Sequence, residues 1–116
     1  MTGQVIGAFH EVYNHLGYGF LESVYAKALE IEFQLRGVPY VREHPLDVLY
    51  KGHVAGSGRA DFLVDVDIVV EIKATRQLGE PDRRQLLHYL KGTKMELGLL
   101  LHFGPKAEFH RMIFTR

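Results

Sequence analysis

The sequence predicts an α/β fold in which a mixed central sheet is flanked by helices, in the order ααβββαββ. Three observations lead to this prediction. Apolar residues recur every three or four positions in the first third of the chain, as they do along one side of a helix. Strand-like apolar segments follow in the middle, and residues 97–103 form an uninterrupted apolar run, which is typical of a buried central strand. Helices packed on a sheet would bury these apolar surfaces.

Two helices are expected at the start of the chain. The first is predicted over residues 5–15, and Gly17-Tyr18-Gly19 ends it. The second is predicted from about residue 20 to residue 36, where Gly37 and then Pro39 stop it. Its apolar residues are assigned to one stripe, the side that a globular helix turns toward the core: Leu21, Val24, Ala28, Ile31 and Leu35.

Three strands are predicted next, over residues 40–50, 54–64 and 68–75. Pro45 has no amide hydrogen to donate, so the first of these strands should carry a bulge or lie at an edge of the sheet. Lys51-Gly52 is a hairpin turn signal between the first and second strands. The three strands should therefore form a meander.

A third helix should begin at Pro81 and stop at Gly92, before strands over residues 97–103 and 109–114. Basic residues gather in and around this helix. They could contact nucleic acid, or simply form a solvated helix face. The residues concerned are Arg76, Arg83, Arg84, Lys91 and Lys94.

Composition indicates one ordinary globular domain over residues 1–116, with 47% hydrophobic and 24% charged residues. No apolar run approaches the ~20 residues that cross a bilayer, and no secretory signal is visible at the N-terminus. Without cysteine there is no disulfide framework, thiolate zinc site or thiol nucleophile. These features favour a cytoplasmic protein. The formal net charge of zero argues against a strongly basic nucleic-acid-binding surface.

The seven histidines do not predict a zinc site. His10 and His15 are five residues apart, whereas two ligands on one helix face need a spacing of four. The other five are scattered along the chain. Most of the histidines are therefore expected at the surface or at element edges.

Three charged residues, Asp61, Glu71 and Lys73, lie within apolar strands. If a tight turn is centred on Val66, Asp61 lies opposite Glu71, with Cβ atoms roughly 4.5–5.5 Å apart. Two carboxylates at that distance repel each other unless a cation lies between them, and Mg²⁺ takes oxygen ligands. The pattern thus predicts a metal site with a lysine beside it, the chemistry of phosphodiester cleavage. The alternative is a surface carboxylate pair with Lys73 in a cross-strand ion pair.

The turn itself is the weakest part of this prediction. Val66 is β-branched and poorly suited to the positive φ of a tight hairpin turn. The turn type, and with it the alignment of Asp61 with Glu71, is therefore open at the level of sequence.

Several sequence blocks carry a resemblance to a known family. Residues 19–25, Gly-Phe-Leu-Glu-Ser-Val-Tyr, resemble the signature of the small bacterial GxxExxY proteins, a branch of the PD-(D/E)XK nuclease superfamily. Six further blocks match in the same order along nearly the whole chain. They are Leu16-Gly17 before Gly19, Tyr50-Lys51-Gly52, Arg59-Ala60-Asp61, Glu71-Ile72-Lys73, residues 85–90 and Gly98-Leu99-Leu100.

The resemblance implies roles for the hairpin residues. Asp61 and Glu71 would hold Mg²⁺, for which Mn²⁺ could substitute, and the main-chain carbonyl of Ile72 would be a third ligand. Lys73 would be the catalytic lysine that orients or activates the attacking water. Glu22 resembles the helix glutamate that reaches into the same site in RecB-like and lambda-exonuclease-like relatives.

Four other residues would support the site. Gln85 and Tyr89 resemble the Gln-x-x-x-Tyr motif that lies beside the site in RecB-like members. Tyr25 lies one turn after Glu22, on the same side of the helix. Arg59 could clamp a phosphate or pair with Asp61, and the pair is the expected outcome.

The predicted function is hydrolysis of nucleic-acid phosphodiester bonds by Mg²⁺-activated water, with DNA favoured over RNA. The alternative is a non-catalytic module that keeps the fold and binds nucleic acid or a protein partner, or an accessory subunit. No membrane partner is expected. A homodimer or a larger protein partner is compatible with either reading.

Overall fold

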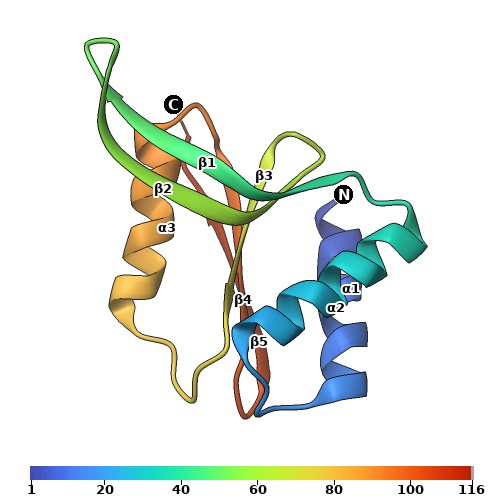
Figure 1. Ribbon diagram of the computed structural model, residues 1–116. Helices are drawn as coiled ribbons and strands as arrows, with labels where there is room; N and C mark the ends of the chain where they lie inside the picture. The colour runs from blue at the N-terminus through green and yellow to red at the C-terminus, as the bar shows by residue number, and fades with distance from the viewer. Residues whose placement is uncertain (116) are drawn as a thin grey trace.

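The computed structural model describes residues 1–115 as a central sheet with helices on both faces (Figure 1). The elements are α1 (Thr2–Leu16), α2 (Glu22–Arg36), β1 (Tyr40–Tyr50), β2 (His53–Val64), β3 (Ile68–Lys73), α3 (Glu80–Gly92), β4 (Leu97–Phe103) and β5 (Ala107–Ile113). This order confirms the predicted ααβββαββ arrangement. None of the helices in these residues is long and apolar enough to cross a membrane.

The sheet is mixed, as predicted, and its strands lie in the order β1-β2-β3-β4-β5. Only β3 and β4 are parallel, and α3 connects them, because parallel neighbours need a crossover. The edge position of β1 accommodates Pro45. The register shift in the β1–β2 ladder falls between Val48 and Leu49 rather than at Pro45.

Each face of the sheet has its own hydrophobic core, and Figure 1 shows α1 and α2 on one side with α3 on the other. Val70 and Ile72 of β3 point into the core under α1 and α2. Val69 points into the core under α3. Because side chains alternate along a strand, Glu71 and Lys73 also lie on the α3 face.

The predicted core stripe of α2 is wrong. The buried residues of this helix are Tyr25, Ala26, Leu29 and Phe33. The stripe that was expected to face the core is largely exposed, at 75% for Leu21, 37% for Val24, 48% for Ile31 and 77% for Leu35. The helix is apolar on two sides, and the side with two aromatic rings packs on the sheet, since these rings bury the larger apolar area.

Candidate metal-binding and catalytic site

The β2–β3 hairpin aligns the two carboxylates as the sequence predicts. Its antiparallel pairs are Phe62 with Val70, Leu63 with Val69, and Val64 with Ile68. The next step of this register sets Asp61 opposite Glu71. At this step a side chain replaces the main-chain acceptor of the ladder. The amide of Ile72 donates a hydrogen bond of 2.6 Å to Oδ2 of Asp61.

The turn holds this register even though it contains Val66. Asp65 and Val66 both adopt the left-handed backbone region, with φ of 53° and 57°. The amide of Asp67 donates to the carbonyl of Val64 at 3.3 Å and closes the turn. A left-handed conformation costs a β-branched residue about 1–2 kcal/mol. The ladder and the buried residues on both sides of it outweigh that cost, because a shifted register would turn them outward.

Burial and like charge raise the pKa values of the acidic residues. The pKa of Glu71 is raised to about 8, first by burial and then by the charge of Asp61. The pKa of Asp61 is also raised by burial, although the Ile72 amide and Lys73 work against the shift. The pKa of Glu22 is raised by burial and then by Asp61. Glu22 at the start of α2 therefore lies close enough to the hairpin to interact electrostatically with Asp61 and Glu71.

The hairpin offers oxygen donors of the kind that a divalent ion takes. Oε1 of Glu71 is buried and has no hydrogen-bond partner among the described residues. A buried polar atom in that state calls for an explanation, and a cation is one. No group of three or more His, Cys, Asp or Glu side chains within residues 1–115 is arranged to hold a metal ion. Two carboxylates, a main-chain carbonyl and water molecules would together supply the oxygen ligands that Mg²⁺ prefers.

The charge of Lys73 opposes the rise in the pKa of all three acidic residues without reversing it. Its Nζ lies 3.8 Å from Oδ1 of Asp82, and both side chains are about one-quarter exposed. The sequence analysis did not include Asp82 in the site. Its Oδ2 accepts a hydrogen bond from the amide of Gly79 at 3.0 Å, so it also caps α3. The sequence signal for this capping role was an acidic residue just after Pro81, in the first turn of the helix.

Tyr25 holds in place the loop that leads from α1 to Glu22. Its ring is completely buried and stacks on Phe103 with centroids 4.1 Å apart. Its hydroxyl donates to the carbonyl of Gly17 at 2.5 Å and accepts from the amide of Phe20 at 3.3 Å. Tyr25 therefore fixes the loop between α1 and α2, and its hydroxyl is not offered to a substrate.

Gln85 and Tyr89, the two site residues predicted on α3, differ in their surroundings. Gln85 is exposed, whereas Tyr89 is partly buried and packs against the core under α3. The phenol of Tyr89 lies directly over Gly58 of β2, where an added Cβ would come within 1.9 Å of its hydroxyl oxygen. Tyr89 therefore lies against the strand that carries Asp61, on the same face of the sheet.

Arg59 does not form the expected ion pair with Asp61. It pairs instead with Glu43 of the edge strand, 3.7 Å from Nη1 to Oε2, and both side chains are more than 60% exposed. The reason is geometric, since Glu43 with φ of 52° interrupts the β1–β2 ladder beside Asp61. A different arginine, Arg42, adds its charge to that of Lys73 in opposing the burial that raises the pKa of Asp61.

One histidine departs from the expected surface positions. His102 of β4 is 3% exposed, and its Nε2 lies 2.7 Å from the carbonyl oxygen of Thr75. It is the parallel neighbour of Lys73. The ring thus ties the segment after β3 to the adjacent strand. A histidine within the apolar run 97–103 was the sequence signal for this position.

Comparisons with known proteins agree with the fold. The model of the PD-(D/E)XK nuclease superfamily matches residues 1–112, and the chain belongs to this superfamily. A solved structure titled "Crystal structure of SSO0001" is similar with a TM-score of 0.62 and 24% identity, over 81% of this chain. The chain spans half the length of that structure, and the likeness concerns the fold. The comparison with curated proteins gave no match.

Proposed function

We propose that this protein is a metal-dependent nuclease that hydrolyses phosphodiester bonds, with Asp61 and Glu71 as the ligands of Mg²⁺. The supporting observation is the register of the β2–β3 hairpin, which sets these two carboxylates opposite each other one step beyond Phe62 and Val70. Among the described residues, one buried oxygen of Glu71 has no hydrogen-bond partner. In this proposal the carbonyl of Ile72 is a further ligand, and Glu22 takes part directly or through water. When bound, Mg²⁺ neutralises the scissile phosphate and lowers the pKa of a coordinated water.

The residues of the chain position the reacting groups. Lys73 would place its ammonium group where negative charge develops on the cleaved phosphate. In this proposal the ion pair with Asp82 keeps the ammonium group of Lys73 near the site until the substrate competes for it. Gln85 and Tyr89 would line the substrate path from α3, and the exposed Arg59 would contact the phosphate backbone after leaving Glu43.

The finer assignment follows the sequence resemblance. We place the chain in the GxxExxY branch, with Mn²⁺ able to replace Mg²⁺ and with DNA favoured over RNA as the substrate. Residues 19–25 carry the signature of that branch, with Glu22 as its glutamate and Tyr25 as its tyrosine. Glu22 is exposed near the hairpin, and Tyr25 is buried under the loop.

A non-catalytic nucleic-acid-binding or partner-binding module is the second candidate. One observation favours it: the formal net charge is zero, whereas binding of a phosphate backbone usually needs a basic surface. In that case the hairpin carboxylates would be a remnant of the superfamily's site. The two candidates make different predictions for cleavage but not for the fold.

The deciding experiment is a cleavage assay on labelled single- and double-stranded DNA and RNA, with Mg²⁺, Mn²⁺ or EDTA. Asp61→Asn and Lys73→Ala should each abolish cleavage. Asp67→Asn is the matched control, because it removes an exposed carboxylate from the turn of the same hairpin. No cleavage of any substrate by the wild type would favour the non-catalytic module. Cleavage that survives Asp61→Asn would place the metal elsewhere.

A further inference from the structure

Helix α2, with Leu21 just before it, has a second apolar side that residues 1–115 leave largely exposed. Its residues occur at positions 21, 24, 28, 31 and 35, so the spacing alternates between three and four. This is the heptad spacing of a and d residues in a coiled coil. Four of these five side chains are at least one-third exposed, while Ala28 is partly buried. We call these five residues the α2 seam.

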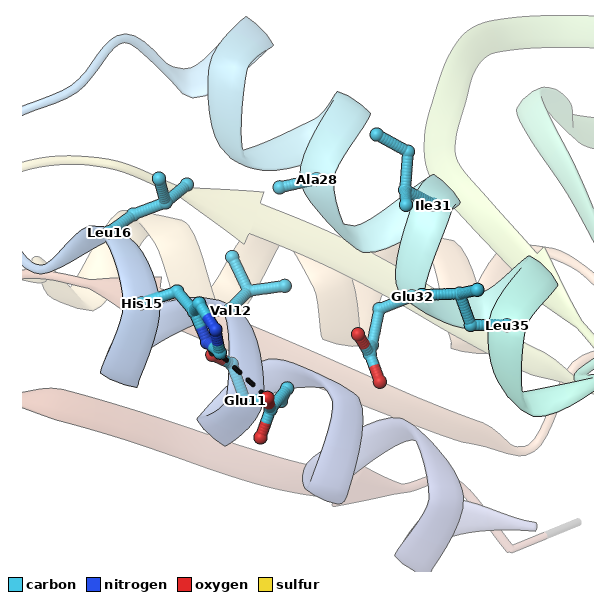
Figure 2. A pocket seen from close by; sticks show the side chains of 8 residues that line it. All are labelled: Glu11, Val12, His15, Leu16, Ala28, Ile31, Glu32 and Leu35. Atoms are coloured by element: carbon cyan, nitrogen blue, oxygen red, sulfur yellow. Dashed lines mark hydrogen bonds and ion pairs between the residues drawn. The ribbon is translucent and has the colours of Figure 1, made fainter.

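A groove lies along the seam where α2 crosses α1. Figure 2 shows its floor and walls, with Val12 and Leu16 from α1 facing Ala28, Ile31 and Leu35 from α2. Its volume is about 330 Å³. A second hollow continues it toward the start of α2. That hollow is lined by Leu16, Ser23, Val24, Lys27, Ala28 and Ile31.

The spacing indicates that the missing cover is a helix. An apolar stripe that repeats every 3.5 residues stays in line with a neighbouring helix, and each side chain can enter a gap between four residues of that neighbour. A strand repeats every two residues and would not match it. Apolar patches of this continuity on a single chain commonly mark a contact with another protein.

The charges beside the seam differ between its two ends. Lys27, with a side chain 68% exposed, lies near the Val24 end, and the carboxylate that it contacts, that of Glu30, is only 18% exposed. Glu11 and Glu32 lie near the Leu35 end, where His15 contacts Glu11 and Arg36 contacts Glu32. Two copies of α2 packed antiparallel would bring the basic end of each to the acidic end of the other. A parallel pair would place like ends together.

We propose that a second copy of this chain covers the α2 seam, with the two α2 helices antiparallel about a two-fold axis. A surface that matches itself under such an axis gives a closed dimer. In the register that sets Val24 beside Leu35 of the second copy, Ala28 lies beside Ile31 of that copy, and Lys27 is level with its Glu32. This inference does not depend on the proposed nuclease activity.

Sedimentation velocity over a concentration series tests the dimer. The wild type should dimerise, and Ile31→Glu should weaken the association at least tenfold. Leu49→Glu is the matched control, because Leu49 is 58% exposed on the β1–β2 hairpin, away from the seam. Circular dichroism and thermal melting establish that both variants are folded. A monomeric wild type at every concentration would overturn the proposal, as would equal weakening by the two variants.

Cross-linking tests the orientation, and the chain suits it because it contains no cysteine. Chains carrying Val24→Cys should form disulfides with chains carrying Leu35→Cys when the two are mixed and oxidised. Disulfides formed only between two Val24→Cys chains would show a parallel pair and overturn the antiparallel arrangement. A monomer that instead binds a synthetic amphipathic helix at the seam would assign the surface to a different protein and overturn the second copy as its cover.

Discussion

The amide of Ile72 donates a 2.6 Å hydrogen bond to Oδ2 of Asp61, across the open end of the β2–β3 hairpin. The regular ladder ends one step earlier, at Phe62 and Val70. The carboxylate of Asp61 thus acts as a ladder acceptor and is held facing Glu71. A side chain fixed by the backbone of the opposite strand loses little entropy when it binds a ligand, which favours metal binding at this position.

A divalent ion should stabilise the fold through these carboxylates. A ligand present at a hundred times its Kd adds roughly 2.7 kcal/mol to the free energy of unfolding. We expect a higher melting temperature in millimolar Mg²⁺ or Mn²⁺ than in EDTA. Asp61→Asn should lose this increase, whereas Asp67→Asn should keep it. An equal increase in the wild type and Asp61→Asn would place the ion outside the hairpin.

Stability in the absence of metal should depend on pH through Glu71. Its pKa is about 8 in the folded protein, against 4.5 for the ordinary carboxyl, so the folded state holds the extra proton between these values. Since the unfolded state binds fewer protons in this window, the free energy of unfolding should fall as pH rises from about 4.5 to 8. Urea titrations in EDTA at several pH values measure the slope. Glu71→Gln should flatten it, and an unchanged slope would contradict this assignment.

Divalent-ion binding should release protons below pH 8. Glu71 is protonated there in the metal-free protein and must ionise to act as a ligand. Calorimetric titration with Mn²⁺ in two buffers of different ionisation enthalpy gives the number of protons released. That number should decrease as the pH approaches and passes 8. Binding without proton release at pH 6 would indicate that Glu71 is not a ligand.

Lys73→Ala should abolish cleavage and leave metal binding intact, because the lysine acts on water and phosphate rather than on the ion. The thermal shift caused by Mn²⁺ reports metal binding separately from activity. Lys94→Ala, which removes an exposed lysine after α3, should leave both unchanged. Cleavage near the wild-type rate in Lys73→Ala would move the catalytic role to another residue.

Gly58→Ala should destabilise the protein by about 1–3 kcal/mol, the usual cost of overpacking. The new Cβ would lie 1.9 Å from the hydroxyl oxygen of Tyr89 and force the phenol away from β2. Gly56→Ala is the matched control on the same strand, where the nearest atom, Cβ of Val48, would be 3.9 Å away. Urea unfolding of both variants measures the difference. The cost should shrink when Tyr89→Ala is combined with Gly58→Ala, and a cost unaffected by Tyr89→Ala would contradict this contact.

The sequence by itself determined the order of the elements and the register of the β2–β3 hairpin. Residues 97–103 could be assigned as a strand to the residue, because an uninterrupted apolar run of that length between turn signals has few other solutions. The alignment of Asp61 with Glu71 followed from counting outward from Val66, although the valine argued against the turn. Local periodicity was sufficient here, since a hairpin is a local structure.

Only the tertiary structure decided which side of α2 faces the core. The sequence contains two overlapping apolar patterns in this helix, one with Tyr25, Leu29 and Phe33 and one with the seam. Periodicity alone cannot rank them, because each satisfies the spacing of a helix face. The choice depends on how well each set of side chains fits the sheet, where Phe33 meets Phe62 with ring centroids 5.2 Å apart.

The partners of Lys73 and Arg59 were likewise decided by the fold. Asp82 and Glu43 are distant from them in sequence, and each ion pair depends on how α3 or β1 lies beside the hairpin. Such contacts are long-range, and no local pattern encodes them. The sequence therefore predicted which residues would carry the proposed chemistry, while packing determined which neighbours contact them and which apolar surface of α2 stays exposed.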